Sequence, residues 1–257
     1  MKLYLHYVSL HIKSLMQHKA SFFLTVIGQF LTSFNVFLGV YFMMQRFHTV
    51  AGFTYSQVLL CFAIMLTAFT LAECFFRGFD TFASTISNGQ FDRILVQPRG
   101  PIFLVLCSKL ELTRVGRLIQ SLVIFAYAIP RSGILWTPFK VLTVFFMLAG
   151  GTLVFAGLFL IYASLCFFTL EGLEFMNVFT DGAREYGKYP VSIYGKRVLL
   201  ICTFLVPFAL FQYYPLLYLI GRAPAAYGLA PIAACLFLCP CLALWRLGIR
   251  HYKSTGS

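Results

Sequence analysis

Long runs without a charged residue constrain this sequence more than any other feature. Residues 20–45 and 141–170 hold 26 and 30 consecutive uncharged residues. About 20 apolar residues are enough to cross a bilayer core of roughly 30 Å as a helix. The runs lack the alternation of apolar and polar residues that marks the strands of a membrane barrel. The sequence therefore predicts an all-α, multi-pass membrane protein that forms a single transmembrane domain over residues 1–257.

The charge balance fits a membrane protein better than a nucleic-acid-binding one. The chain is 60% hydrophobic and 11% charged, with a formal net charge of +12, whereas a soluble domain carries roughly 25% charged residues. In a membrane protein, Lys and Arg hold loops on the cytoplasmic side and face anionic lipid. Charged and histidine residues spread through residues 1–19 argue against a cleavable signal peptide. The eight cysteines lie in or beside apolar runs, so no structural disulfide is expected.

We predict six transmembrane helices, of which two are unusual. The simpler ones are residues 20–45, 55–76, 141–170 and 223–245. Only 13 uncharged residues separate Arg117 from Arg131, so the third span must begin inside the charged stretch before it, or Arg131 must reach outward. The fifth, residues 198–221, contains Pro207 and Pro215. These prolines predict a broken span whose outer part re-enters the membrane before span six.

Residues 1–19 are expected to form an amphipathic helix in the plane of the lipid headgroups. Its polar residues recur every three or four positions, at Lys2, His6, Ser9, Lys13 and Gln17. Apolar residues face away from this stripe, as in helices that lie on a membrane surface. A cytoplasmic helix packed on a partner is the alternative.

The distribution of basic residues predicts the topology. Sixteen of the 20 Lys and Arg residues fall on one side of the six predicted spans, and Arg46, Arg131, Lys140 and Arg222 fall on the other. Cytoplasmic loops carry the excess of Lys and Arg. Both termini and the two polar inserts, residues 77–100 and 171–197, are therefore predicted to be cytoplasmic.

The first insert, which we call the coupling region (residues 77–100), is predicted to hold a short amphipathic helix between spans two and three. One apolar face is formed by Phe79, Phe82, Ala83 and Ile86, which follow helical spacing. Asp80 lies off that face. Asn88 and Gly89 form a helix stop, since glycine accepts the left-handed backbone that closes a last turn. In the second insert, Asp181 with Arg184 and Glu185 with Lys188 are three apart, as on a surface helix.

Polar residues inside the spans suggest structural roles or a transport path. Glu73 is expected near the membrane interface and paired with Arg77, four residues later. Gln29, Ser33 and Asn35 lie in the first span, where polar side chains turn toward protein or a water-filled path. Hydrogen bonding between helices and a substrate path were equally favoured for these three residues.

Common catalytic motifs are missing from the sequence. There is no G-x-x-x-x-G-K-[ST] phosphate-binding loop, no H-E-x-x-H zinc motif and no G-x-S-x-G elbow. We therefore predict no catalytic residue, no metal site and no cofactor in this chain. Cys239-Pro240-Cys241 resembles the cysteines of some metal pumps, but a place in the core is favoured because cysteine is so often buried.

Several short motifs resemble a known family. They are Arg77-Gly78, the run Gly89-x-Phe91-Asp92-x-x-Leu95-x-x-Pro98, and Gly182-x-Arg184-Glu185 followed by Tyr189-Pro190 and Ile193-Tyr194. With six spans and an insert after the second, the chain resembles permease subunits of ATP-binding-cassette exporters of the second type. The resemblance is closest to the small bacterial branch found in multidrug and antibiotic export, and it covers essentially the whole chain.

This resemblance implies an assembly in the bacterial cytoplasmic membrane. Two permeases, identical or paralogous, would bind two ATPase subunits that carry ATP and Mg. The helix after span two would be the coupling helix that fits a cleft in the ATPase. The residues implied in that contact are Phe79, Asp80, Phe82, Ala83, Ile86, Asn88, Gly89, Phe91 and Asp92, with Arg184 and Glu185 as a second contact.

Two other functions remain open on the sequence alone. An ion-driven carrier would act without an ATPase and would use Glu73 as its titrating group. A membrane enzyme or scaffold would show turnover by the purified chain. The coupling prediction is specific: Phe82→Asp or Ile86→Asp is expected to abolish stimulated ATPase activity while leaving membrane insertion intact.

Overall fold

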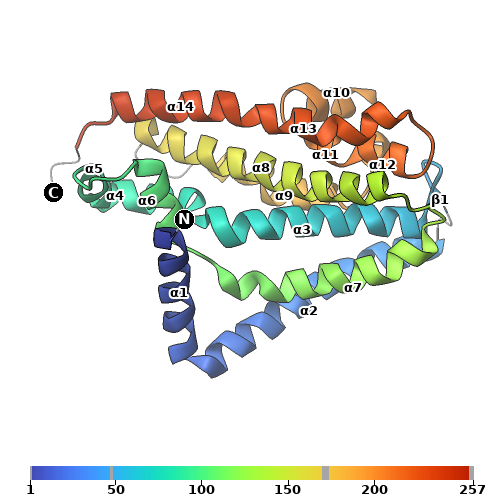
Figure 1. The fold of residues 1–257 in the computed structure, drawn as a ribbon, viewed down its shortest axis with the longest axis horizontal. Coiled ribbons are helices and arrows are strands. Elements are labelled where there is room, and N and C mark those ends of the chain that lie inside the picture. Colours follow the sequence, from blue (N-terminus) through green and yellow to red (C-terminus); the bar gives the residue numbers. More distant parts are fainter. Residues whose placement is uncertain (1, 47–48, 170–173, 255–257) are drawn as a thin grey trace.

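Long helices that run roughly along one direction form the body of the molecule (Figure 1). The computed structural model describes residues 2–46, 49–169 and 174–254. The long helices are α2 (Lys19–Arg46), α3 (Tyr55–Asp80), α7 (Val115–Arg131), α8 (Pro138–Thr169) and α14 (Leu238–His251). α3 is the central helix and is buried along most of its length, with α7 packed on one side and α8 on another. An all-α membrane fold is confirmed.

The described residues contain five helices long and apolar enough to cross a membrane, or six if one bent pair counts as a span. The third begins at the 3-10 turn η1 (Leu112–Arg114), so it starts inside the charged stretch, the first of the two options above. The fifth is broken as predicted. α10 (Lys196–Phe204) meets α11 (Phe208–Phe211) and α12 (Tyr213–Leu219) at a bend of 86° beside Pro207.

The sixth span is assembled from several short pieces that follow one another along the chain. These are η4 (Ala225–Leu229), α13 (Ala230–Ala234), η5 (Cys235–Phe237) and then α14. Together they run over residues 225–251, packed along α8. At the same end of the molecule as α12, a two-stranded ribbon of β1 (Thr49–Val50) and β2 (Phe53–Thr54) joins α2 to α3 (Figure 1).

Glycines let the helices around α3 approach closely. A methyl group at Gly151 of α8 would lie 2.8 Å from Ala68 Cβ and from the Phe211 ring. At Gly78 of α3 it would lie 2.0 Å from the carbonyl oxygen of Val105 in α6 (Pro101–Ser108). Both positions therefore require a residue without a side chain.

The opposite end of the molecule carries most of the short helices. α4 (Phe82–Ser87), α5 (Gln90–Leu95) and α6 lie beyond the end of α3, together with α1 (Lys2–Gln17) and the end of α14 (Figure 1). Gly89 has the left-handed backbone expected of a helix stop, with φ 64°. The N-terminal helix and the last described residues both contact this part of the molecule. His11 Nε2 lies 3.1 Å from the Cys107 carbonyl oxygen, and the Tyr252 hydroxyl donates a hydrogen bond to Asp92. That this end is cytoplasmic stays a prediction.

The second polar insert does not form a separate surface layer. Its first residues, 171–173, lie outside the described residues. The rest forms η2 (Glu174–Val178), α9 (Asp181–Tyr186) and η3 (Val191–Tyr194), which lead into α10. α9 packs on α3, and the bent pair that can form the fifth crossing starts after this stretch, at Lys196.

Candidate functional site

The coupling region folds back onto its own chain through an aromatic cluster. Phe79, Phe82 and Phe91 are at most 2% exposed. The Phe82 ring centroid lies 5.2 Å from those of both Phe167 in α8 and Trp245 in α14. Phe91 lies 5.1 Å from Phe167 in the same edge-to-face way. Such aromatic pairs add to the gain from burying the rings, so α4 and α5 are firmly attached to α8 and α14.

This packing bears on the predicted ATPase contact, which stays a prediction. The apolar face of the coupling region was expected to contact the ATPase, but Phe79, Phe82, Ile86 and Phe91 are buried within the chain. Gly89 is also buried and Ala83 is half-buried. These side chains cannot make a direct contact while this packing holds. An Asp at residue 82 or 86 would be buried without a partner, so the fold would be disturbed along with any coupling.

The exposed face of the coupling region is mostly polar. Its exposed residues on and between α4 and α5 are Ser84, Ser87, Asn88, Gln90, Arg93 and Leu95, of which only the last is apolar. Val96, just beyond α5, is 84% exposed. Of the residues implied in an ATPase contact, Asn88 alone is fully on this face. A partner of this end of the molecule would meet hydroxyls, amides and a guanidinium rather than the aromatic rings.

Asp92 fastens the end of the chain to the coupling region. Its Oδ1 accepts a hydrogen bond from the Tyr252 hydroxyl at 3.0 Å, and its Oδ2 accepts one from Ser254 at 2.7 Å. The Tyr252 ring also packs edge-to-face on Phe91, with centroids 5.0 Å apart. Burial, the hydrogen bond to Asp92 and the negative charge of that residue raise the pKa of Tyr252. We call this set of contacts the Asp92 clasp.

A buried ion cluster lies where α3 meets α7. Glu73 is 3% exposed, and its carboxylate lies 2.6 Å from Arg117 Nη1 and 3.3 Å from Arg114 Nη2. The predicted pair with Arg77 is confirmed, at 3.8 Å. Arg77 also pairs with Asp80, and Glu111 lies 3.0 Å from Arg114 Nε. The cluster ties the end of α3 to the start of α7.

The charged helix α9 lies beside the middle of α3. The Arg184 guanidinium is 5.4 Å from the centroid of the Phe69 ring, and a methyl group at Gly187 would lie 2.0 Å from Met65 Cε. Met65 and Phe69 are the eleventh and fifteenth of the 26 residues of α3. The Gln212 side chain, at the break between α11 and α12, donates a hydrogen bond to the Gly187 carbonyl. That Arg184 and Glu185 make a second contact with the ATPase stays a prediction.

The predicted ion pairs of α9 are present, and they remain open to the surroundings. Arg184 pairs with Asp181 at 3.8 Å, and Lys188 pairs with Glu185. The side chains of Asp181 and Glu185 are 55% and 47% exposed. A charged side chain at the centre of a bilayer costs on the order of 3 kcal/mol. Exposed carboxylates at this depth therefore require water or protein around them.

A groove of about 450 Å³ separates α9 from the middle of α2. Asn35, predicted to line a substrate path, borders this groove opposite Glu185 and Lys188. Ser33 borders a second, smaller cavity of about 20 Å³ that also touches Arg117 and Arg184, which is room for one water molecule. Gln29, the third predicted residue, borders neither cavity. Its Oε1 is buried and has no hydrogen-bond partner among the described residues.

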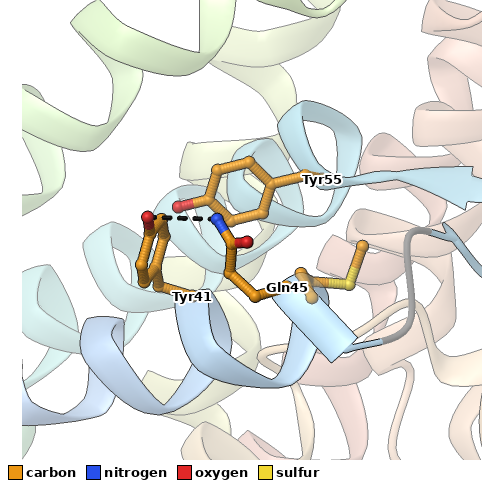
Figure 2. A pocket seen from close by; sticks show the side chains of 4 residues that line it. Tyr41, Gln45 and Tyr55 are labelled. Atoms are coloured by element: carbon orange, nitrogen blue, oxygen red, sulfur yellow. Dashed lines mark hydrogen bonds between the residues drawn. The ribbon is translucent and has the colours of Figure 1, made fainter.

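A separate pocket of about 220 Å³ lies at the end of the molecule that carries β1 (Figure 2). Tyr41 and Gln45 of α2 face Tyr55 at the start of α3. Gln45 Nε2 donates a hydrogen bond to the Tyr41 hydroxyl at 3.0 Å, and the Tyr41 and Tyr55 ring centroids are 6.0 Å apart. Tyrosine is typical of membrane–water interfaces, and the pocket lies where the end of α2 meets the start of α3. None of the predicted site residues borders it.

Comparison with known families gives a match over most of the chain. Residues 30–256 match the model of the ABC-2 family transporter proteins. The chain belongs to this family. The matched stretch begins inside α2, so α1 and the start of α2 precede it. A search among curated proteins and a search among solved structures each found no match.

Membership in the ABC-2 family accounts for the architecture of the chain. It is a multi-pass membrane subunit of an ABC transporter, of a kind that generally has no catalytic centre of its own and works with an ATPase. The resemblance stated from the sequence motifs is therefore confirmed. The short helices at one end of α3 and the broken fifth span are features of this ABC-2 permease.

Sequence reasoning missed the main partners of Glu73. Arg117 is 44 residues away along the chain, and only the packing of α7 on α3 brings the two together. A signal was present, because Arg117 stands at the start of an apolar run too short to span alone. An Arg inside a span needs a carboxylate partner, and Glu73 was the acidic residue available in the neighbouring span.

Proposed function

We propose that this ABC-2 permease is the transmembrane subunit of an ATP-driven exporter whose ATPase subunits are separate chains. Two permeases, identical or paralogous, would work with two ATPases that hold ATP and Mg. The complex would lie in the cytoplasmic membrane of a bacterium. Its cargo would be a drug-like, peptide, lipid or glycan molecule. The observation that carries this proposal is the family match over residues 30–256.

The geometry of the coupling region supports a mechanical role. α4 and α5 are held by aromatic contacts to α8 and α14, and the ion cluster links the same end of α3 to α7. A push on the exposed face of α4 would therefore reach four long helices at once, α3, α7, α8 and α14. ATP binding in the partner subunits would move these spans as rigid bodies between inward-open and outward-open states.

An ion-driven carrier that uses Glu73 has less support. That role needs a carboxylate able to take up and release a proton during transport. Glu73 instead lies within 4 Å of guanidinium nitrogens of Arg77, Arg114 and Arg117. Both carboxylate oxygens of Glu73 are thus taken up by guanidinium groups, an arrangement that suits a structural ion pair between helices better than a proton relay.

The first experiment identifies the partner. The tagged chain is purified gently from its own host, and the proteins that accompany it are identified. We expect a subunit with a G-x-x-x-x-G-K-[ST] motif, together with ATP hydrolysis by the complex. A chain that purifies without any such subunit, and that moves cargo on a proton gradient alone, would contradict the proposal.

The second experiment locates the contact. Asn88→Trp adds bulk to the exposed face of α4, and Leu135→Trp is the matched control, because Leu135 is 84% exposed in the loop between α7 and α8. We expect Asn88→Trp to lower stimulated ATPase activity without changing the thermal unfolding temperature, and Leu135→Trp to change neither. Phe82→Asp should lower both. Full stimulation by the Asn88→Trp complex would show that ATPase contact lies elsewhere.

A further inference from the structure

The groove between α2 and α9 lies about halfway along α2 and is bordered by charged side chains. Arg184 of α9 lies beside the middle of α3, with Glu185 next to it in the helix and Lys188, just beyond the helix, paired with Glu185. Asn35, on the facing wall, is the seventeenth of the 28 residues of α2. The groove therefore lies well inside the membrane if α2 and α3 span it. Its exposed carboxylates cannot face hydrocarbon.

The walls of the groove differ in polarity. Glu185, Lys188 and Tyr189 line one side, while α2 contributes Val36, Val40 and Met43 beside Asn35. A molecule in the groove would meet hydrogen-bonding groups on one side and aliphatic groups on the other. This is the pattern of sites that bind molecules with a polar head and an apolar body.

The charges of α9 cancel. Asp181 pairs with Arg184 inside the helix, and Glu185 accepts hydrogen bonds from Arg184 and from Lys188, which lies two residues beyond the helix end. The groove therefore offers donors and acceptors at close range but little net charge. A head group without net charge can form these hydrogen bonds. An anion or a cation would find no net opposite charge in the groove to attract it.

We propose that the groove between α9 and the middle of α2 is a water-filled binding site for amphipathic molecules whose polar head is uncharged or zwitterionic. The inference rests on the proposed exporter function and narrows its cargo. The adjoining cavity at Ser33 and Arg117 continues the polar surface toward Glu73. Polar groups thus extend from the ion cluster through α9 to Asn35.

The test measures which positions meet water within the membrane. Asn35→Cys, Glu185→Cys and Tyr189→Cys are made in the full chain, in vesicles that contain the complete complex. Each is treated with a charged, membrane-impermeant thiol reagent, and the modified peptide is identified by mass against the unsubstituted chain. Leu122→Cys is the matched control, because Leu122 of α7 is 64% exposed and so is more open in the isolated chain than the Glu185 side chain.

We expect Asn35→Cys and at least one of the other two to react about a hundredfold faster than Leu122→Cys, which faces lipid. Rates equal to that of Leu122→Cys would overturn the proposal. So would disulfides between two copies at these positions without any reaction with the reagent, because a second chain would then fill the groove. Three positions are used so that one poorly folded variant does not decide the outcome.

A second measurement tests the class of head group. Detergents with a twelve-carbon tail are added below their micelle concentrations, with sugar, phosphocholine, sulfate or trimethylammonium heads. We expect the sugar and phosphocholine heads to slow the labelling of Asn35→Cys, and the two charged heads to slow it less. Equal protection by all four, or by none, would overturn the assignment. Labelling does not depend on the ATPase, so loss of the exporter function and loss of the groove remain distinguishable.

Discussion

Glu73 and Arg117 link two helices through a single buried contact. Arg117 is 7% exposed, and its Nη1 lies 2.6 Å from Glu73 Oε2. Breaking a buried pair by removing one partner is costly, because the other charge stays behind without compensation. Arg114 and Arg77 remain near Glu73, so the cost of losing Arg117 should be partly offset.

Arg117→Gln is expected to destabilise the protein by about 2 kcal/mol, and adding Glu73→Gln should recover part of that loss. Thermal unfolding of the purified complex in detergent measures both effects. Arg131→Gln is the control, since Arg131 is exposed and stacks only on the Tyr127 ring. A double variant that is less stable than Arg117→Gln alone would contradict the assignment.

The Asp92 clasp offers a test with a pH dependence. Tyr252→Phe keeps the ring against Phe91 but removes the hydrogen bond to Asp92. We expect a cost of about 1 kcal/mol, seen as a roughly fivefold faster cleavage by trypsin after Lys253. The pKa of Tyr252 is raised in the folded protein. The clasp should therefore be complete below the ordinary tyrosine pKa of about 10 and be lost as pH rises through the raised value.

In the Tyr252→Phe variant the cleavage rate should no longer depend on alkaline pH in this way, because the hydroxyl that titrates is gone. If trypsin cleaves Tyr252→Phe and the unsubstituted protein after Lys253 at the same rate at pH 8, the hydrogen bond does not hold residues 252–254 in place.

Among the helices, α8 depends on its glycines. Gly151→Ala is expected to destabilise the protein by about 1–3 kcal/mol, because the new methyl group would overlap Ala68 and the Phe211 ring. Gly28→Ala in α2 is the matched control, since among the described residues no atom beyond the helix's own nearby backbone lies within 4 Å of a methyl group there. Alanine favours a helix over glycine by roughly 0.5–1 kcal/mol, so Gly28→Ala should be neutral or stabilising. Thermal unfolding of the two variants side by side checks the difference.

The positions of the helices could be predicted from the sequence, but which helices pack against each other could not. Runs of uncharged residues located the spans, Gly89 ended α4, and Pro207 marked the break in the fifth crossing. The spacing of Phe79, Phe82 and Ile86 correctly indicated one apolar face. It could not tell that α8 and α14 would bury this face, because periodicity does not identify the partner of a face.

The depth of α9 was hidden for a related reason. Ion pairs three residues apart look the same on a cytoplasmic surface as beside a water-filled path inside a membrane. The position of Arg184 at Phe69 follows from the packing of α9 on α3, which no local pattern encodes. The link between Glu73 and Arg117 likewise depends on how α7 lies against α3.

At the scale of the whole molecule, α2 is the span least covered by its own chain. Most of its surface is exposed, including Leu24, Ile27, Leu31 and Phe42. α7 covers one side near Gly116, where a methyl group would lie 2.2 Å from the Val26 carbonyl. The side that carries Asn35 stays open.

This open side has a consequence for how the protein is made. An orphan copy would present the amide of Asn35 and the charges of α9 to lipid, which is what membrane quality control degrades. We expect the cellular half-life of this permease to fall severalfold when its assembly partners are deleted, as a pulse-chase measurement would show. Asn35→Leu should lengthen the life of the orphan copy. Expression of this transporter would then be set by the scarcest member of its complex.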